Sequence, residues 1–105
     1  MESGKKIVYI AGPITGVDKY WEAFEEMEDE LSALGYIPLS PSRLPSGMSN
    51  NRYTRICFAM IDAADAVIFL PGWESSAGAT LEREYCFYTG KLICLNPYFL
   101  REVLG

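Results

Sequence analysis

The sequence of 105 residues has no histidine, few basic residues and no long apolar run. Without imidazole, Ser-His-Asp triads, Cys-His dyads and nearly all zinc hydrolase sites are excluded, because each requires a histidine side chain. Proton transfer near neutral pH must therefore come from carboxylates, tyrosine, cysteine or lysine. The sequence predicts neither a metal site nor a cofactor.

Basic residues are outnumbered, with Lys plus Arg at 9 against 14 Asp plus Glu, for a net charge of −5. Domains that bind duplexes usually carry the opposite sign, so a nucleic acid polymer is not an expected partner. The apolar runs are shorter than the roughly 18 residues of a membrane span, and Met1–Lys6 lacks the layout of a signal peptide. We expect one domain over residues 1–105, located in the cytoplasm.

Cysteine is also scarce, since only Cys57, Cys86 and Cys94 are present and they form no C-x-x-C pair. An odd number of cysteines at these spacings is not typical of a disulfide framework or a metal site. We predict buried thiols in a reducing compartment.

Short apolar segments alternate with segments of helical periodicity. Strands are expected at residues 7–11, 36–39, 66–70 and 91–95, and helices at residues 18–34, 52–64 and 77–89, with a short helix at the end. This order predicts an α/β fold with right-handed crossovers: a small doubly wound parallel sheet, flavodoxin- or Rossmann-like, with strand order 2-1-3-4 and helices on both faces. Ligands of such sheets bind beyond the strand carboxyl ends, where the winding direction reverses. Residues 12–16 and 71–79 flank that point.

Local signals add detail to the helices. Asp18 is the expected N-cap of the first helix and Gly35 its terminating residue. Its inward face is expected to hold Trp21, Phe24, Met27, Leu31 and Leu34, and its solvated face to hold Glu22, Glu25, Glu26, Glu28, Asp29 and Glu30. In the second helix, the residues expected to face inward are Ile56, Ala59 or Met60, and Ala63. The intervening loop, residues 40–51, is long enough to be a candidate lid, and Arg43 near it is expected to be a free surface arginine.

The first loop of the expected crevice consists of Gly12, Pro13, Ile14, Thr15 and Gly16. Glycine permits close backbone approach to a ligand, and a loop that enters a helix favours anions. The loop matches neither G-x-G-x-x-G nor a Walker A motif. A tight turn that needs small residues explains it equally well.

The second loop leads into a helix that Ser76 can cap, and Gly78 and Ala79 leave space over its first turn. Glu82 lies three and four residues beyond these small residues, hence on the same face, and we expect it to look into the crevice. The alternative is that Glu82 only favours the helix dipole. Trp73 either stacks on a base or packs in the core. The Tyr9 hydroxyl either reaches the pocket or is satisfied within the core.

At these residues the sequence resembles the nucleoside 2-deoxyribosyltransferase superfamily, and most of all its small phage and bacterial branch of uncharacterised (DUF4406-like) proteins. The matching segments are residues 9–16, residues 64–73, Ser76-x-Gly78-Ala79-x-x-Glu82, and Gly90-Lys91. Together they span nearly the whole chain in the right order.

The resemblance implies that Glu82 is a nucleophile that attacks C1′ of a 2-deoxyribosyl unit and expels the base. Tyr9 would orient this glutamate, and Ser76 with the loop 12–16 would hold the sugar or a 5′-phosphate. The covalent glycosyl-enzyme would be resolved by water or by a second base, as in a retaining glycosidase. The resemblance also implies a homodimer or larger homo-oligomer, whose pocket a neighbouring chain completes.

The sequence departs from the superfamily at Cys57, where relatives carry an aspartate near the leaving base. A thiol is a poor proton donor to a base nitrogen at neutral pH. Either another acid such as Asp62 replaces it, or the chain binds a nucleoside or nucleotide without cleaving it, as a sensing or sequestering module. A third interpretation is a structural protein whose acidic helix docks a basic partner.

Overall fold

Four short strands form the centre of the structure, a computed structural model that describes residues 4–104. The helices and strands follow the chain in the order β1 (Ile7–Ala11), α1 (Tyr20–Ala33), β2 (Ile37–Leu39), η1 (Pro41–Arg43), α2 (Asn50–Ala63), β3 (Ala66–Phe69), η2 (Trp73–Ser75), α3 (Ala77–Thr89), β4 (Leu92–Cys94), η3 (Pro97–Phe99) and α4 (Leu100–Leu104). Every strand and helix that the sequence predicts is present, with small differences at the ends.

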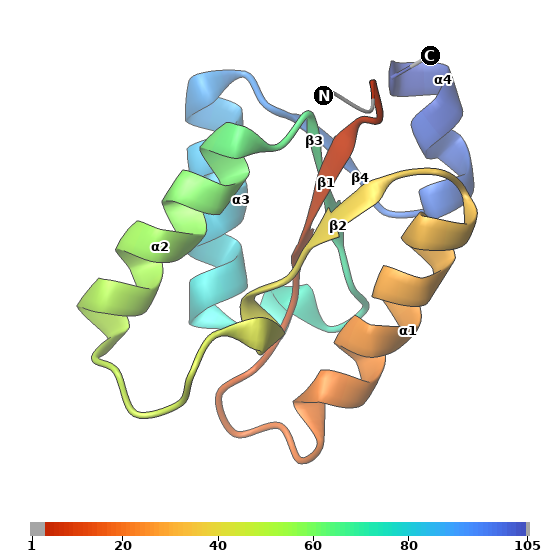
Figure 1. Cartoon of the computed structure of the whole chain (residues 1–105). Helices are drawn as coiled ribbons and strands as arrows, with labels where there is room; N and C mark the ends of the chain where they lie inside the picture. Colours follow the sequence, from red (N-terminus) through yellow and green to blue (C-terminus); the bar gives the residue numbers. More distant parts are fainter. Residues whose placement is uncertain (1–3, 105) are drawn as a thin grey trace.

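All strand pairs are parallel, and the strand order is β2-β1-β3-β4. This confirms the predicted doubly wound α/β sheet with order 2-1-3-4. Val8 pairs with Ala66 and Ala11 with Phe69, so β1 and β3 end at the same edge. The loops after these strands therefore leave the sheet together, at the lower edge in Figure 1. This carboxyl edge is where the winding direction reverses and where a ligand is expected.

The two faces of the sheet are covered by different helices, α1 and α4 on one side and α2 and α3 on the other (Figure 1). Successive strand residues point to opposite faces. Val8 and Ile10 accordingly pack with residues of the first side, among them Phe24, Leu31 and Leu100. The second core contains Tyr9, Ala11, Val67, Phe69, Cys57, Ile61 and Cys86. Tyr9 thus faces α2 and α3.

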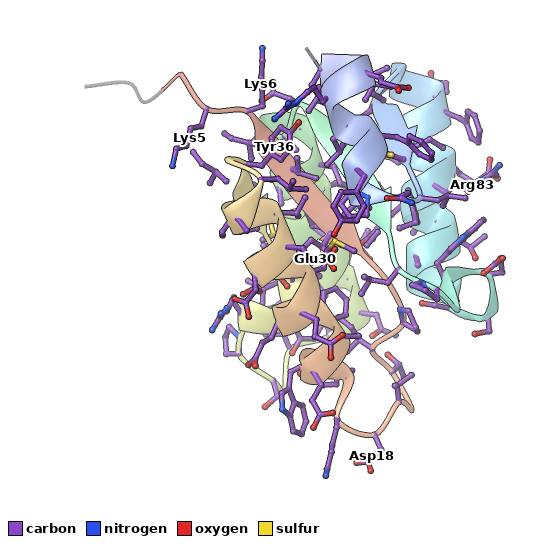
Figure 2. The ribbon with its side chains drawn as sticks, turned by 90° about the vertical axis from the view of Figure 1, so that its right-hand side faces the viewer. Lys5, Lys6, Asp18, Glu30, Tyr36 and Arg83 are labelled. Carbon is purple, nitrogen blue, oxygen red and sulfur yellow. The ribbon has the colours of Figure 1, made fainter. Side chains whose placement is uncertain are left out.

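The start of α1 differs from the prediction, whereas its end agrees. Asp18 is not the N-cap; Lys19 holds that position with a left-handed φ of 51°, and no side chain caps the helix. Asp18 instead lies at the tip of the preceding loop, far from Lys6 (Figure 2). Gly35 has a φ of 95°, and the next N–H, that of Tyr36, donates to Leu31 O at 2.9 Å. This is a glycine-terminated helix, as predicted.

For two residues of α1, the exposure of the side chain is the reverse of the prediction. Trp21, expected inside, is 45% exposed, because it stands in the first turn, near the end of the sheet. Glu28, expected on the solvated face, is buried. The segment after β2 folds over α1 and brings Arg43, whose Nε donates to Glu28 Oε2 at 3.3 Å and whose Nη2 donates to Oε1. Arg43 is therefore not a free surface arginine.

The buried face of α2 is also shifted from the prediction. Cys57 and Ile61 are buried, Ile56 and Met60 are half-buried, and Ala59 and Ala63 are exposed. Met60 packs against the second core, as the prediction allowed. Cys57 and Ile61 are four residues apart and so share a face. The prediction did not include Cys57, although free cysteine is among the residue types most often buried.

The long loop before α2 is tied down within the protein. The Tyr53 hydroxyl donates to Pro45 O at 2.6 Å and accepts from the N–H of Met48 at 3.2 Å. Ser49 accepts from the N–H of Arg52 and caps α2. The role of this loop as a lid stays a prediction.

Within residues 4–104, no helix is long and apolar enough to cross a membrane. The prediction about Met1–Lys6 falls partly outside the described residues. One domain over residues 1–105 likewise stays a prediction.

Candidate active site

Tyr9 and Glu82 meet at the centre of the candidate site. Tyr9 points from β1 towards α2 and α3 and has no exposed surface. Glu82 lies in the second turn of α3, and its side chain is partly exposed. The Tyr9 hydroxyl donates to Glu82 Oε2 at 2.9 Å. The structure therefore brings together the two residues that the sequence singles out as orienting group and nucleophile.

Burial changes the protonation of Glu82. Loss of solvation raises the pKa of this carboxyl group from 4.5 to about 7, against the hydrogen bonds of Tyr9 and Cys57, which lower it. Burial also raises the pKa of Tyr9, which the nearby Glu82 charge raises further, so the tyrosine keeps its proton and remains a donor. Near neutral pH, Glu82 exists in comparable amounts as acid and carboxylate.

Two thiols lie next to this pair. Cys57 of α2 interacts with both Tyr9 and Glu82, and burial is the largest cause that raises the pKa of its thiol to about 11. Cys86 of α3 is buried, and its thiol pKa is also raised to about 11, by burial and then by the charge of Glu82. Both thiols are therefore protonated at neutral pH, so Glu82 has uncharged neighbours.

The structure does not bring Asp62 to Glu82. Asp62 lies near the end of α2, where its Oδ1 accepts from the Tyr85 hydroxyl at 2.7 Å. Helix α2 runs antiparallel to the strands, so its last turn lies at the amino edge of the sheet, opposite to the candidate site (Figure 1). This placement gives no support to Asp62 as a substitute acid.

Asp65 lies at the same amino edge and acts there as a structural residue. Its Oδ2 accepts from the Ile7 N–H at 2.7 Å, and its own N–H donates to Ile7 O at 2.7 Å. These two bonds join the beginnings of β1 and β3.

Packing against Leu70 explains why the first loop begins with a glycine, Gly12. A Cβ atom on Gly12 would lie 2.9 Å from Cδ1 of Leu70 and 3.0 Å from its Cβ. Gly12 is itself buried, whereas Thr15 and Gly16 are exposed. Gly16 has a φ of 78° in a turn where Val17 N–H donates to Ile14 O. The contact between the two loops thus explains Gly12 without a ligand. Pro13–Gly16 are the part of the first loop that a ligand could contact.

The second loop begins α3 as predicted. Ser76 is its N-cap, and Ser76 Oγ accepts from the Ala79 N–H at 3.2 Å. A Cβ atom on Gly78 would have only Ser76 Oγ nearby, at 4.0 Å, so space is open there. Ala79, expected beside that space, is instead buried in the protein.

Trp73 packs against protein. Its ring meets Phe69 edge-on with centroids 5.4 Å apart, and the Arg83 guanidinium lies over it at 5.2 Å. Arg83 also lies 4.4 Å from the centroid of the Phe87 ring. These contacts favour the core-packing interpretation of Trp73.

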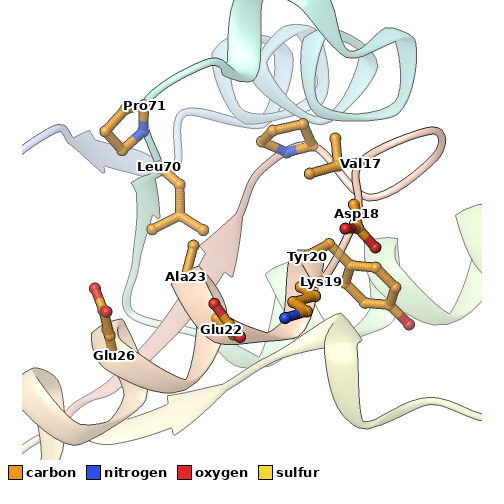
Figure 3. A pocket seen from close by; sticks show the side chains of 10 residues that line it. Val17, Asp18, Lys19, Tyr20, Glu22, Ala23, Glu26, Leu70 and Pro71 are labelled. Carbon is orange, nitrogen blue, oxygen red and sulfur yellow. The ribbon is translucent and has the colours of Figure 1, made fainter.

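A cavity of about 340 Å³ opens at the carboxyl edge of the sheet, but Glu82 does not line it. Its walls come from the loops after β1 and β3 and from the first turns of α1, and include Pro13, Leu70, Pro71, Asp18, Glu22 and Glu26 (Figure 3). It lies on the α1 side, whereas Glu82 lies on the α2 and α3 side. This cavity is therefore not the crevice predicted for Glu82.

No group of three or more histidine, cysteine, aspartate or glutamate side chains within residues 4–104 could hold a metal ion.

A family model described as "Domain of unknown function (DUF4406)" matches residues 6–95. The chain belongs to this family. The DUF4406 domain is similar in structure to a protein described as a 2-desoxiribosyltransferase from Leishmania mexicana, with a TM-score of 0.69 and 23% sequence identity. The match covers 86% of this chain and 63% of that one, so the domain spans less than two thirds of that protein. This likeness shows the fold. No curated protein matches the sequence.

The predicted site of the DUF4406 domain omits Cys86, although its position carries a signal. Cys86 follows Glu82 by four residues, a spacing that places two side chains on one face of a helix. The interaction of Cys57 with Tyr9 has no comparable signal, because it depends on how α2 packs against β1.

Proposed function

We propose that this domain cleaves the N-glycosidic bond of a 2-deoxyribonucleoside or its 5′-monophosphate, with Glu82 as nucleophile. The observation that carries the proposal is the hydrogen bond of 2.9 Å from the Tyr9 hydroxyl to Glu82. This bond holds one carboxylate oxygen in place at the switch point of a doubly wound sheet. The similar fold of a protein described as a 2-desoxiribosyltransferase supports the choice of sugar.

The proposed reaction has two displacements at C1′. An oxygen of ionised Glu82 forms a bond to C1′ while the C1′–N bond breaks and its electron pair goes to the base nitrogen. Water then replaces Glu82 at C1′ and releases a proton to solvent, or the nitrogen of a second base replaces it. Two inversions give net retention. Hydrolysis and transfer thus share the same glycosyl-enzyme.

Ser76 and the first loop are the proposed contacts to the sugar or a 5′-phosphate. Ser76 Oγ accepts one backbone hydrogen bond, and a hydroxyl still has its own proton to donate and a second lone pair. Gly78 leaves space beside it. Pro13–Gly16 emerge at the same edge of the sheet (Figure 1).

The test is release of free base from a panel of deoxynucleosides and their 5′-monophosphates, followed by chromatography. We expect Glu82→Gln to lower the rate by about 10³-fold or more, as loss of a nucleophile does. Glu84→Gln is the matched control, since Glu84 is exposed on the same helix, and it should act like the unmodified protein. Mass spectrometry should find a deoxyribosyl adduct on Glu82. Equal release by Glu82→Gln contradicts the proposal.

One observation favours a second candidate function, binding without cleavage. Cys57, at the position where the resemblance implies an acid near the leaving base, has its thiol pKa raised to about 11 by burial. A site without a proton donor binds a nucleotide and leaves it intact. In that case a nucleoside monophosphate raises the melting temperature by mass action while no base is released.

We further propose that the domain forms a homo-oligomer in the cytoplasm. Its cysteines are free, which fits a reducing compartment. Most of the exposed large apolar side chains belong to α3, β4 and the residues directly after β4: Leu81, Phe87, Tyr88, Leu92, Leu95, Tyr98 and Phe99. Strand β4 is also an edge of the sheet, where a second copy can pair about a two-fold axis. Light scattering of the purified protein distinguishes a dimer from a monomer.

A further inference from the structure

The groups that shift the pKa of Glu82 are uncharged. They are the Tyr9 hydroxyl on β1 and the Cys57 thiol on α2. The third neighbour, Cys86, lies on the same helix as Glu82 and is a protonated thiol. The next residue along α3, Arg83, is placed over the rings of Trp73 and Phe87. The carboxylate therefore lacks a charge partner in its immediate surroundings within residues 4–104.

The same surroundings offer a leaving base no effective acid. The proton of Tyr9 is donated to Glu82. The Cys57 thiol holds its proton too tightly to act as a general acid near neutral pH. Asp62 accepts a hydrogen bond from Tyr85 at the far end of α2. Around Glu82, the described residues thus supply a proposed nucleophile and its orienting group, but no carboxylic acid to protonate a base nitrogen.

We infer that the substrates are N-glycosides whose leaving group carries a positive charge before cleavage, such as purine nucleosides alkylated at N7 and pyridinium nucleosides. This rests on the proposed function and narrows its substrate class. A cationic base departs as a neutral molecule and so requires no proton from the protein. Its charge also supplies what Glu82 lacks, since a cation nearby favours ionisation of a buried carboxyl group. A neutral nucleoside provides neither advantage.

The bonds and charges of the first step balance without another reactant. Glu82 Oε forms an ester bond to C1′ as the C1′–N9 bond breaks, and both electrons of that bond pass to N9. The positive charge of the purinium ring is thereby cancelled, and the base leaves as a neutral molecule. Water then adds at C1′, loses a proton to solvent and frees the carboxylate.

The experiment compares 7-methyl-2′-deoxyguanosine with 2′-deoxyguanosine, which share sugar and ring system and differ in the charge at the alkylated nitrogen. Spontaneous release in buffer is subtracted from each rate. We expect kcat/KM to be at least about 100-fold higher for the methylated nucleoside, because general acid catalysis contributes about 10²- to 10⁴-fold. A smaller ratio overturns the inference and leaves the proposed function standing. Release of base from neither compound overturns both.

A variant provides a second, independent readout on the same pair of substrates. Cys57→Asp places a carboxyl group where the thiol contacts Tyr9 and Glu82. We expect the ratio of the two kcat/KM values to fall by about 100-fold, because only the neutral base needs the acid, whereas any effect of the new carboxyl group on the ionisation of Glu82 acts on both substrates. Cys57→Ser is the matched control and should raise neither rate.

Cys57 is buried, so the fold of Cys57→Asp is checked by circular dichroism. A folded variant that leaves the ratio unchanged overturns the inference. If the variant fails to fold, the inference is decided by the comparison of the two nucleosides on the unmodified protein alone.

Discussion

Gly12 and Leu70 approach so closely that a Cβ atom on the glycine would lie 2.9 Å from Cδ1 and 3.0 Å from Cβ of the leucine. They follow β1 and β3, and the Leu70 N–H donates to Ala11 O at 2.8 Å directly beside them. A rotation of the Leu70 side chain could move Cδ1 away but not Cβ. The contact therefore joins the first residues of both carboxyl-edge loops through the backbone of one and the side chain of the other.

Gly12→Ala should destabilise the protein by about 1–3 kcal/mol, the usual cost of overpacking a core. Gly78→Ala is the matched control, because its Cβ atom meets only Ser76 Oγ at 4.0 Å and alanine is favoured over glycine in a helix by about 1 kcal/mol. Urea denaturation measures both. Equal stability of the two variants contradicts the packing argument.

The proposed activity on a neutral or cationic substrate should rise with pH, because Glu82 must be ionised to act as the proposed nucleophile. Burial raises the pKa of Glu82 to about 7, so the rate increases through neutrality and levels off above it. The titratable neighbours, Tyr9, Cys57 and Cys86, all have pKa values raised above their usual range and stay protonated across this interval. A profile of kcat/KM from pH 5 to pH 9 that is flat or falls through neutrality contradicts this assignment.

The contribution of Glu82 to the stability of the fold should fall as pH rises, whereas the activity should increase. The pKa of Glu82 is about 7 in the folded state and 4.5 in its usual environment, so the unfolded state loses its proton first as pH rises. The contribution of Glu82 to the free energy of unfolding is then full below pH 4.5 and declines up to about pH 7, by on the order of 3 kcal/mol at most. Glu82→Gln should remove this decline and melt above the unmodified protein at pH 8. Glu84→Gln, on the exposed face, should keep it.

Tyr9→Phe removes the hydrogen bond that lowers the pKa of Glu82. A hydrogen bond to a charged group contributes about 1.5–3 kcal/mol, and one pH unit corresponds to 1.36 kcal/mol. The midpoint of the activity profile should therefore move upward by about one pH unit, with a lower kcat at neutral pH. Tyr85→Phe is the control, since its hydroxyl contacts Asp62 instead, and it should leave the midpoint unchanged.

Much of the fold follows from local signals in the sequence. The continuous apolar run of residues 66–70 predicts a central strand covered on both faces, and β3 (Ala66–Phe69) is buried throughout. Gly90 ends α3 with a φ of 75°, as a glycine after the last helical residue predicts. Ser76 and Glu82 could be placed on one helix by spacing alone. These features depend on neighbours within one or two turns.

Other features depend on contacts across the fold and therefore escape such prediction. Glu28 is buried because Arg43 from a later segment covers it, and the helix sequence carries no sign of that. Asp62 and Cys57 share one helix, but only the packing of α2 shows that Cys57 faces the candidate site and that Asp62 lies at the opposite edge of the sheet. The distance of each residue from Glu82 thus depends on tertiary packing and not on the local sequence.

The two halves of the candidate site come from distant parts of the polypeptide, since the hydrogen-bonded Tyr9 and Glu82 are 73 positions apart. During synthesis, β1 leaves the ribosome long before α3 exists, so its tyrosine has no carboxyl partner to contact. Closing so long a segment costs entropy that only the assembled sheet and its helices repay. A nascent chain that ends before Ala77 lacks Glu82 altogether. Catalytic competence should therefore arise late, together with completion of the tertiary structure.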